Sequence, residues 1–82
     1  MSWSISKGET FIIDEKRRLK LKAVSLYRYY VQAVFLLYTD IVERVIVRKI
    51  DNRDCMYIGG VLHFSSKDVL NKLIDDIVKE VT

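Results

Sequence analysis

The sequence contains no proline, three glycines and one cysteine among its 82 residues. A single cysteine excludes an internal disulfide, and a small domain without disulfides is typical of a reducing compartment. No apolar run approaches the ~20 residues that a membrane-spanning helix needs. The first six residues also lack the basic start and the apolar stretch of a signal peptide. We therefore expect a cytoplasmic protein without a membrane segment.

Linkers rich in proline, internal repeats and low-complexity segments are missing as well. The chain therefore predicts a single domain over residues 1–82. Half of its residues are hydrophobic, which excludes intrinsic disorder as the main state. Because so short a chain can build only a thin core, this apolar content favours a homodimer or another oligomer that shares apolar surface.

Groups suited to catalysis are scarce. His63 is the only histidine, and a general base needs a positioned partner. A pair between Cys55 and His63 fits across a hairpin, but the sequence shows no acid that would orient it. A zinc site needs about four ligands, more than Cys and His supply here. Gly59 and Gly60 lack the rest of a phosphate loop. We expect no enzyme, no metal and no cofactor.

Positive charge is concentrated in the first part of the chain. Residues 1–50 carry ten basic and five acidic side chains, whereas residues 51–82 carry four basic and six acidic ones. Such a field attracts nucleic acid, acidic proteins or anionic surfaces. A solvated face without a partner is the simpler interpretation.

Most of the chain carries strand patterns, with apolar and polar residues in alternation or in short β-branched runs. We predict strands over residues 2–6, 10–13, 18–26, 29–38, 42–50, 55–58 and 61–64. Polar clusters at 14–17 and 51–54 predict turns, and Asp40 suits the cap of a short helical turn. Gly59 and Gly60 indicate a tight hairpin or a bulge in one continuous strand.

Residues 16–38 combine the two main features of the sequence. The pleat of the first strand here places Leu19, Leu21 and Ala23 on one face and basic residues on the other. Residues 29–38 are apolar on both faces, as in a central strand that is covered on two sides. A helix over residues 23–37 is the alternative. The β-branched and aromatic content favours strands.

The C-terminal segment predicts a helix. Residues 65–68 form a capping-box pattern with Asp68 at the third helical position. Apolar residues then recur at helical spacing from Val69 to Val81 and form one stripe. This stripe is expected to cover one face of the sheet. The predicted fold class is α+β, an antiparallel sheet of about five or six strands with one C-terminal amphipathic helix packed on it.

One constellation suits binding, a basic strand followed by tyrosines. Alternate lysines on a strand lie about 6.6 Å apart and can follow a phosphate backbone. Nearby tyrosine rings can stack on bases, as they do in single-strand binders. Basic residues of the strand over 42–50 extend this patch if the two strands are neighbours. The predicted nucleic-acid contacts are Arg17, Arg18, Lys20, Lys22, Arg28, Tyr27, Arg44, Arg48 and Lys49.

Residues 8–15, Gly-Glu-Thr-Phe-Ile-Ile-Asp-Glu, resemble the start of the carbon storage regulator family of small dimeric RNA-binding proteins. The segment Val45–Lys49 is similar to the last strand of that family and its basic end. The resemblance covers about the first fifty residues and implies RNA as ligand, a homodimer, and Arg48 and Lys49 as anion contacts. Ile5 and Ser6 depart from it, because the family carries basic RNA-contacting residues there.

These features predict a small non-enzymatic regulatory protein that contacts the backbone of RNA or DNA through a basic-aromatic strand face. A protein–protein interaction module, such as an inhibitor or adaptor for an acidic partner, is one alternative, because tyrosine and arginine are frequent at interface hot spots. A small subunit of an oligomeric assembly is the other.

Overall fold

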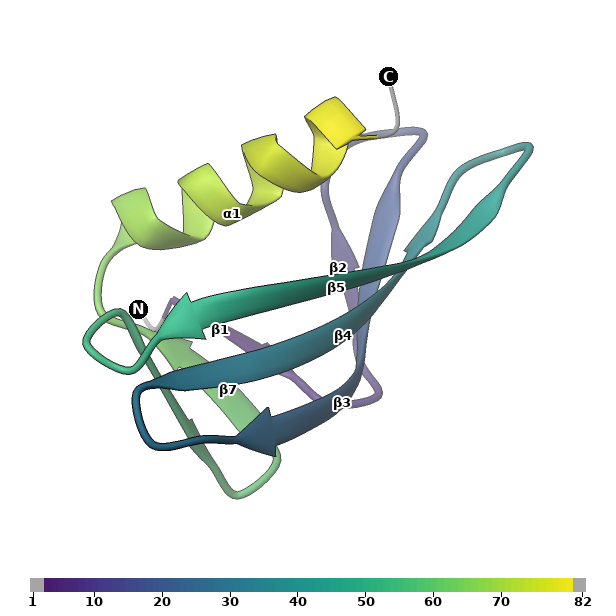
Figure 1. Cartoon of the computed structure of the whole chain (residues 1–82). Coiled ribbons are helices and arrows are strands. Elements are labelled where there is room, and N and C mark those ends of the chain that lie inside the picture. The colour runs from purple at the N-terminus through teal and green to yellow at the C-terminus, as the bar shows by residue number, and fades with distance from the viewer. Residues whose placement is uncertain (1–2, 81–82) are drawn as a thin grey trace.

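A computed structural model describes residues 3–80 (Figure 1). The elements are β1 (Ser4–Ser6), β2 (Thr10–Ile12), β3 (Arg18–Leu26), β4 (Tyr30–Tyr38), β5 (Glu43–Asp51), β6 (Cys55–Ile58), β7 (Val61–Phe64) and α1 (Lys67–Glu80). The strands form two antiparallel sheets, with the orders β1-β7-β6 and β2-β3-β4-β5. The α+β prediction is confirmed, although the strands number seven in two sheets. A helix over residues 23–37 is excluded. The predicted positions Ser2 and Val81 lie outside the described residues.

The two sheets and the helix enclose one core. In Figure 1 the three-stranded sheet lies behind the four-stranded sheet, and α1 runs along β5 at the upper side. Phe35 on β4, Leu62 on β7 and Ile77 on α1 are all almost inaccessible to solvent. Each layer therefore contributes side chains to a single apolar cluster.

Strand β4 is the centre of the larger sheet, since it pairs with β3 on one side and with β5 on the other. Its burial alternates strictly, with Phe35 and the other odd-numbered residues in the core and the even-numbered residues half-buried. The even-numbered residues line the opposite surface of the sheet, which we call the outer face. Val45 and Val47 of β5 lie on this face and are 60% and 46% exposed. Within residues 3–80, therefore, β4 is fully covered on one face only.

Strand β3 contains a β-bulge at Lys22, because its register with β4 shifts between Leu21 and Ala23. One extra residue moves the following side chains to the other face of a strand. Ala23 consequently pairs with Val34 on the outer face. The prediction that groups Ala23 with Leu19 and Leu21 is wrong for this reason.

The turn predicted at Gly59 and Gly60 is present in the structure, whereas the helical turn suggested near residue 40 is not. Gly59 and Gly60 have φ angles of 59° and 78°, as a two-residue hairpin turn requires, so the hairpin prediction is confirmed. Asp40 caps no helical turn. The connection at residues 39–42 is irregular, and the N–H of Val42 donates to Oγ1 of Thr39 at 3.0 Å.

Helix α1 begins at Lys67, and the preceding serine caps it. The N–H of Val69 donates to Oγ of Ser66 at 3.3 Å, which is the bond from the third helical residue to the N-cap. Asp68 is therefore the second helical residue, and the predicted capping box is displaced by one position. Asp68 still lies in the first turn, where a negative charge interacts favourably with the helix dipole.

The cap assignment predicts different effects for the two neighbouring serines. Ser66→Ala is expected to lower the free energy of unfolding by about 1 kcal/mol, since it removes the cap. Ser65→Ala, the matched control, is expected to change it by less than about 0.5 kcal/mol. Urea unfolding followed by circular dichroism measures both. Equal losses for the two variants would contradict the assignment.

Candidate nucleic-acid interface

The nine residues that the sequence assigns to a nucleic-acid interface do not form one patch. Tyr27, Arg28 and Lys49 lie at the end of the four-stranded sheet where β3 turns into β4. Arg18 and Lys20 lie on the outer face at the other end. The nine residues of β4 separate these ends, which is about 27 Å of strand.

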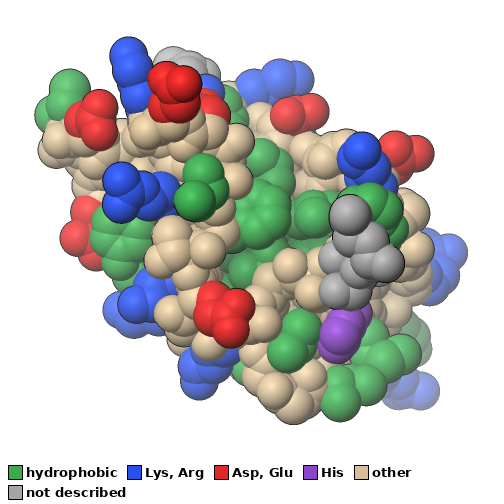
Figure 2. Space-filling model, turned by 180° about the vertical axis from the view of Figure 1, so that it is seen from behind, with side chains coloured by type: hydrophobic (Ala, Val, Ile, Leu, Met, Phe, Trp, Pro, Cys, Tyr) green, Lys and Arg blue, Asp and Glu red, His purple; other side chains and the backbone are tan. Residues whose placement is uncertain are grey.

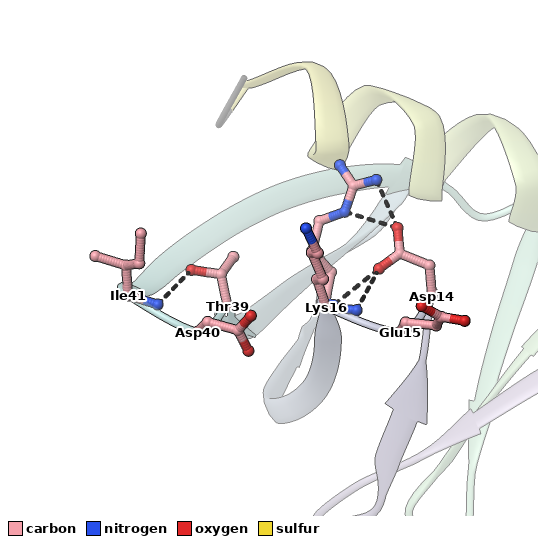
Figure 3. A pocket seen from close by; sticks show the side chains of 7 residues that line it. Asp14, Glu15, Lys16, Thr39, Asp40 and Ile41 are labelled. Atoms are coloured by element: carbon pink, nitrogen blue, oxygen red, sulfur yellow. Dashed lines mark hydrogen bonds and ion pairs between the residues drawn. The ribbon is translucent and has the colours of Figure 1, made fainter.

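Two further predicted contacts, Lys22 in β3 and Arg17 just before this strand, lie outside both of these groups. Lys22 occupies the bulge and is exposed. Arg17 donates from Nε to Oδ2 of Asp14 at 2.9 Å, in the connection between β2 and β3 (Figure 3). This hydrogen bond from Arg17, together with the N–H of Lys16, holds the pKa of the Asp14 carboxyl below its usual value. Arg17 is thus already paired.

The basic residues of β5 do not extend the basic face of β3, because β4 lies between the two strands. Arg44 and Arg48 alternate with Val45 and Val47, so they project from the opposite surface of the sheet. Nη2 of Arg48 lies 2.7 Å from Oε1 of Glu80 on α1. Arg48 therefore ties β5 to the helix.

At the end of the sheet with Arg18, the connections at residues 14–17 and 39–41 flank a hollow of about 570 Å³ (Figure 3). A second groove of about 400 Å³ is lined by Lys16, Arg18 and Lys20 together with Tyr38 and Asp40. This groove gathers three cations beside one ring. The Asp40 carboxylate in the same wall opposes an anionic ligand there.

The opposite end carries a cluster of aromatic rings and cations that we call the tyrosine turn, residues 27–30. The rings of Tyr27 and Tyr30 are stacked, with centroids 4.8 Å apart and planes inclined by 16°. Nζ of Lys49 lies 5.2 Å from the Tyr30 centroid, and Cζ of Arg28 lies 5.3 Å from the Tyr29 centroid. Both are cation–π distances. Tyr29 is 71% exposed and Tyr27 is 48% exposed, so their rings are open to a ligand.

The neighbouring turn between β5 and β6 holds the tyrosine turn in place. Nδ2 of Asn52 donates to the carbonyl oxygens of Arg28 at 2.8 Å and of Tyr27 at 3.3 Å. The N–H of Asn52 donates to the carbonyl oxygen of Tyr29 at 3.1 Å. In Figure 1 both turns lie at the left end of the sheet. The backbone that carries the exposed rings is thus fixed before any ligand binds.

Sequence reasoning names Tyr27, Arg28 and Lys49 but gives Asn52 no role beyond a turn. The sequence did indicate such a role for Asn52, because asparagine in a turn commonly donates to nearby backbone carbonyls. What the sequence does not show is which carbonyls it meets. Arg28 lies 24 positions before Asn52, and only the pairing of β4 with β5 brings the two turns together.

The cysteine and the histidine lie on opposite faces of the three-stranded sheet. Cys55 pairs with Phe64 on the buried face. His63 is exposed on the other face, as the view from behind shows (Figure 2). A Cys–His pair across this hairpin is therefore excluded. Burial, with smaller effects from the charges of Asp54 and Asp51, raises the pKa of the Cys55 thiol to about 11.

Comparisons with known proteins found no match to this chain among protein families, curated proteins or solved structures. Within residues 3–80 the structure contains no helix that could cross a membrane. In the same range, no cluster of three or more histidine, cysteine or acidic side chains is arranged to hold a metal ion. The function must therefore be inferred from the surface of the chain itself.

The surroundings of Cys55 predict a thiol that reacts slowly in the native state. A pKa near 11 leaves roughly a hundredfold less thiolate at pH 8 than an ordinary cysteine has, and thiolate is the reactive form. The rate of reaction with a disulfide reagent is expected to rise at least by this factor when urea unfolds the protein. His63→Ala is expected to leave the native rate unchanged. A slower native reaction in this variant would mean that the histidine activates the thiol.

Proposed function

We propose that this protein binds single-stranded nucleic acid at the tyrosine turn. The observation that carries the proposal is the pair of exposed rings, Tyr27 and Tyr29, held beside Arg28 and Lys49 by the backbone clamp from Asn52. Exposed aromatic rings bind bases by stacking, and neighbouring cations neutralise phosphates. A clamped turn loses little conformational entropy on binding.

The geometry suits unpaired bases better than a duplex. A ring at a turn can stack only on a base whose face is open, and bases within a duplex have both faces covered by their neighbours. The resemblance of the first fifty or so residues to the carbon storage regulator family supports the same class of ligand. Of the two anion contacts that it implies, Lys49 lies in the cluster, whereas Arg48 is paired with Glu80.

The groove around Arg18 and Lys20 supports this function less well. It also contains positive charge and one ring, that of Tyr38. Its Tyr38 ring is half-buried, however, and Asp40 stands in its wall. At the tyrosine turn the Asp51 carboxylate lies opposite Tyr30, but the guanidinium of Arg53 already holds it at 3.0 Å. A phosphate therefore meets less repulsion there.

An acidic protein partner is the second candidate, and the composition of the same cluster favours it. Tyrosine and arginine side chains that are exposed and close together are typical of interface hot spots. The two candidates differ in what competes for the site. A complex with an acidic protein survives nuclease treatment, whereas a complex with nucleic acid does not.

The stacking role of Tyr29 is tested by two substitutions that differ only in aromatic character. Tyr29→Leu is expected to weaken binding to a fluorescent single-stranded oligonucleotide by ~1–3 kcal/mol, or about five- to 150-fold. Tyr29→Phe keeps the ring and is expected to bind within about twofold of the unmodified protein, because stacking needs no hydroxyl. Fluorescence anisotropy with RNA and DNA oligonucleotides measures both variants.

Ile58→Leu serves as the matched control, because Ile58 is 59% exposed on the other sheet. It is expected to change nothing. Affinity should also fall steeply as salt rises, since phosphate neutralisation releases counterions. Binding that does not respond to salt, or that is equal for Tyr29→Leu and Tyr29→Phe, would contradict the proposal.

Asn52 is a positioning residue, because it holds the turn without facing the ligand. Asn52→Ala is expected to weaken oligonucleotide binding and to speed hydrogen exchange of the Tyr27 amide, whose N–H donates to the carbonyl oxygen of Tyr30 within the turn. Arg53→Lys changes the adjacent residue of the same turn, keeps the positive charge beside Asp51 and is the control. Faster exchange without weaker binding would show that rigidity of the turn does not contribute to affinity.

A further inference from the structure

The outer face of the four-stranded sheet carries a cluster of apolar side chains although no element among residues 3–80 covers it. The register of the strands places five adjoining apolar side chains on it, namely Ala23, Val34, Leu36, Val45 and Val47. Lys20, which pairs with Leu36, borders this cluster on the side of β2. Val45 is 60% exposed and Val47 is 46% exposed. A contiguous apolar surface on so small a domain marks a site that another molecule covers.

Charges flank this apolar area on opposite sides. Arg18 on β3 and Glu43 on β5 lie in one row of the outer face, because each pairs with Tyr38 on β4 between them. Both side chains are exposed. Neither forms an ion pair within the described part of the chain. Across the sheet, this row therefore carries a positive charge, an aromatic ring and a negative charge. A second copy that presents the same row in the opposite order places each charge against its opposite.

This pattern selects one way of packing two copies face to face. A two-fold axis parallel to β4 sets β3 of one copy opposite β5 of the other, so Arg18 meets the partner's Glu43 at two equivalent places. An axis across the strands instead sets Glu43 opposite the partner's Asp51, at the other end of β5, where the carboxylate is already bonded to Arg53 and offers Glu43 no free cation. Like charges in contact are unfavourable, and opposite charges in contact are favourable. The charges thus favour the parallel axis.

We propose that the outer face binds a second copy of this chain about a two-fold axis parallel to β4. Val34 and Leu36 then pack against their own copies, and the two sheets form a sandwich with a spacing of about 10 Å. Three strands over nine residues give a footprint of roughly 400 Å². Standard interfaces bury ~800 Å² per partner, so we expect a dimer that dissociates on dilution.

The dimer adds to the proposed nucleic-acid function without depending on it. Tyr30 and Lys49 lie at the end of the outer face, but Tyr27 and Tyr29, whose rings are proposed to stack on bases, belong to the connection between β3 and β4. An axis parallel to β4 preserves the direction of the strands. Both tyrosine turns therefore lie at the same end of the sandwich. One nucleic-acid strand could then contact both turns, and linked sites bind more tightly than either alone.

The orientation is tested by exchanging the two charges. Sedimentation equilibrium over a range of concentrations is expected to show a reversible dimer for the unmodified protein. Arg18→Glu and Glu43→Arg are each expected to weaken association about tenfold or more, since each places like charges together twice in the dimer. The double variant with both changes is expected to restore association. Failure of the double variant to recover would overturn the parallel-axis arrangement.

The face itself is tested by a matched pair of lysine substitutions. Val45→Lys on the outer face is expected to leave a monomer. Ile58→Lys on the three-stranded sheet, at nearly the same exposure, is expected to leave the dimer intact. Thermal melting of each variant shows whether it is folded. A strictly monomeric unmodified protein at every concentration, or a dimer lost only in Ile58→Lys, would overturn the proposal.

Oligonucleotide binding by the folded Val45→Lys monomer shows separately whether the tyrosine turn binds nucleic acid.

Discussion

The pairing of β4 with strands on both of its sides is the constraint on which the other features depend. A strand with two neighbours cannot slip, because a shift of one residue would move Phe35 and every other core side chain of β4 to the surface. The same register decides what the outer face contains. The alternation of side chains along β4 thus determines both the core and the exposed apolar surface. A change of register would alter both together.

The larger sheet offers two chemically different surfaces. Its outer face carries a cluster of aliphatic side chains on β4 and β5, bordered by Lys20 on β3, so this cluster suits another apolar surface. The end that bears the tyrosine turn carries rings and cations that are already in contact with one another. Because Tyr27 and Tyr29 lie in the connection between β3 and β4, outside the paired strands, their rings stay accessible when the outer face is covered.

The elements of the fold were largely predictable from the sequence. Alternation, β-branched residues and the glycine pair at 59 and 60 identify most strands and turns, and helical spacing identifies α1. These signals are local, and each acts within a few residues of the chain. The bulge at Lys22 was not predictable, since the residues around it fit a regular strand as well.

The candidate site was predictable only in its composition. The sequence shows that cations and tyrosines are close along the chain, but it does not show which of them a carboxylate has already paired. Arg17 with Asp14 is a local pair and was within reach of sequence reasoning. Arg48 with Glu80 joins residues 32 positions apart. Ion pairs of this kind depend on how the helix packs against the sheet, and no local sequence pattern shows that packing.

Strand β1 has a further consequence for the order in which the chain folds. Its partner is β7, so Ser4 pairs with His63 across almost the whole domain. Strands β2 to β5 pair with their neighbours in sequence and can assemble as the chain emerges from the ribosome. The residues of β1 are synthesised before those of β7 but can pair only after the β6–β7 hairpin exists. Because such long-range pairings close late and slowly, Ile5 lacks its partner on β7 until Leu62 has been synthesised.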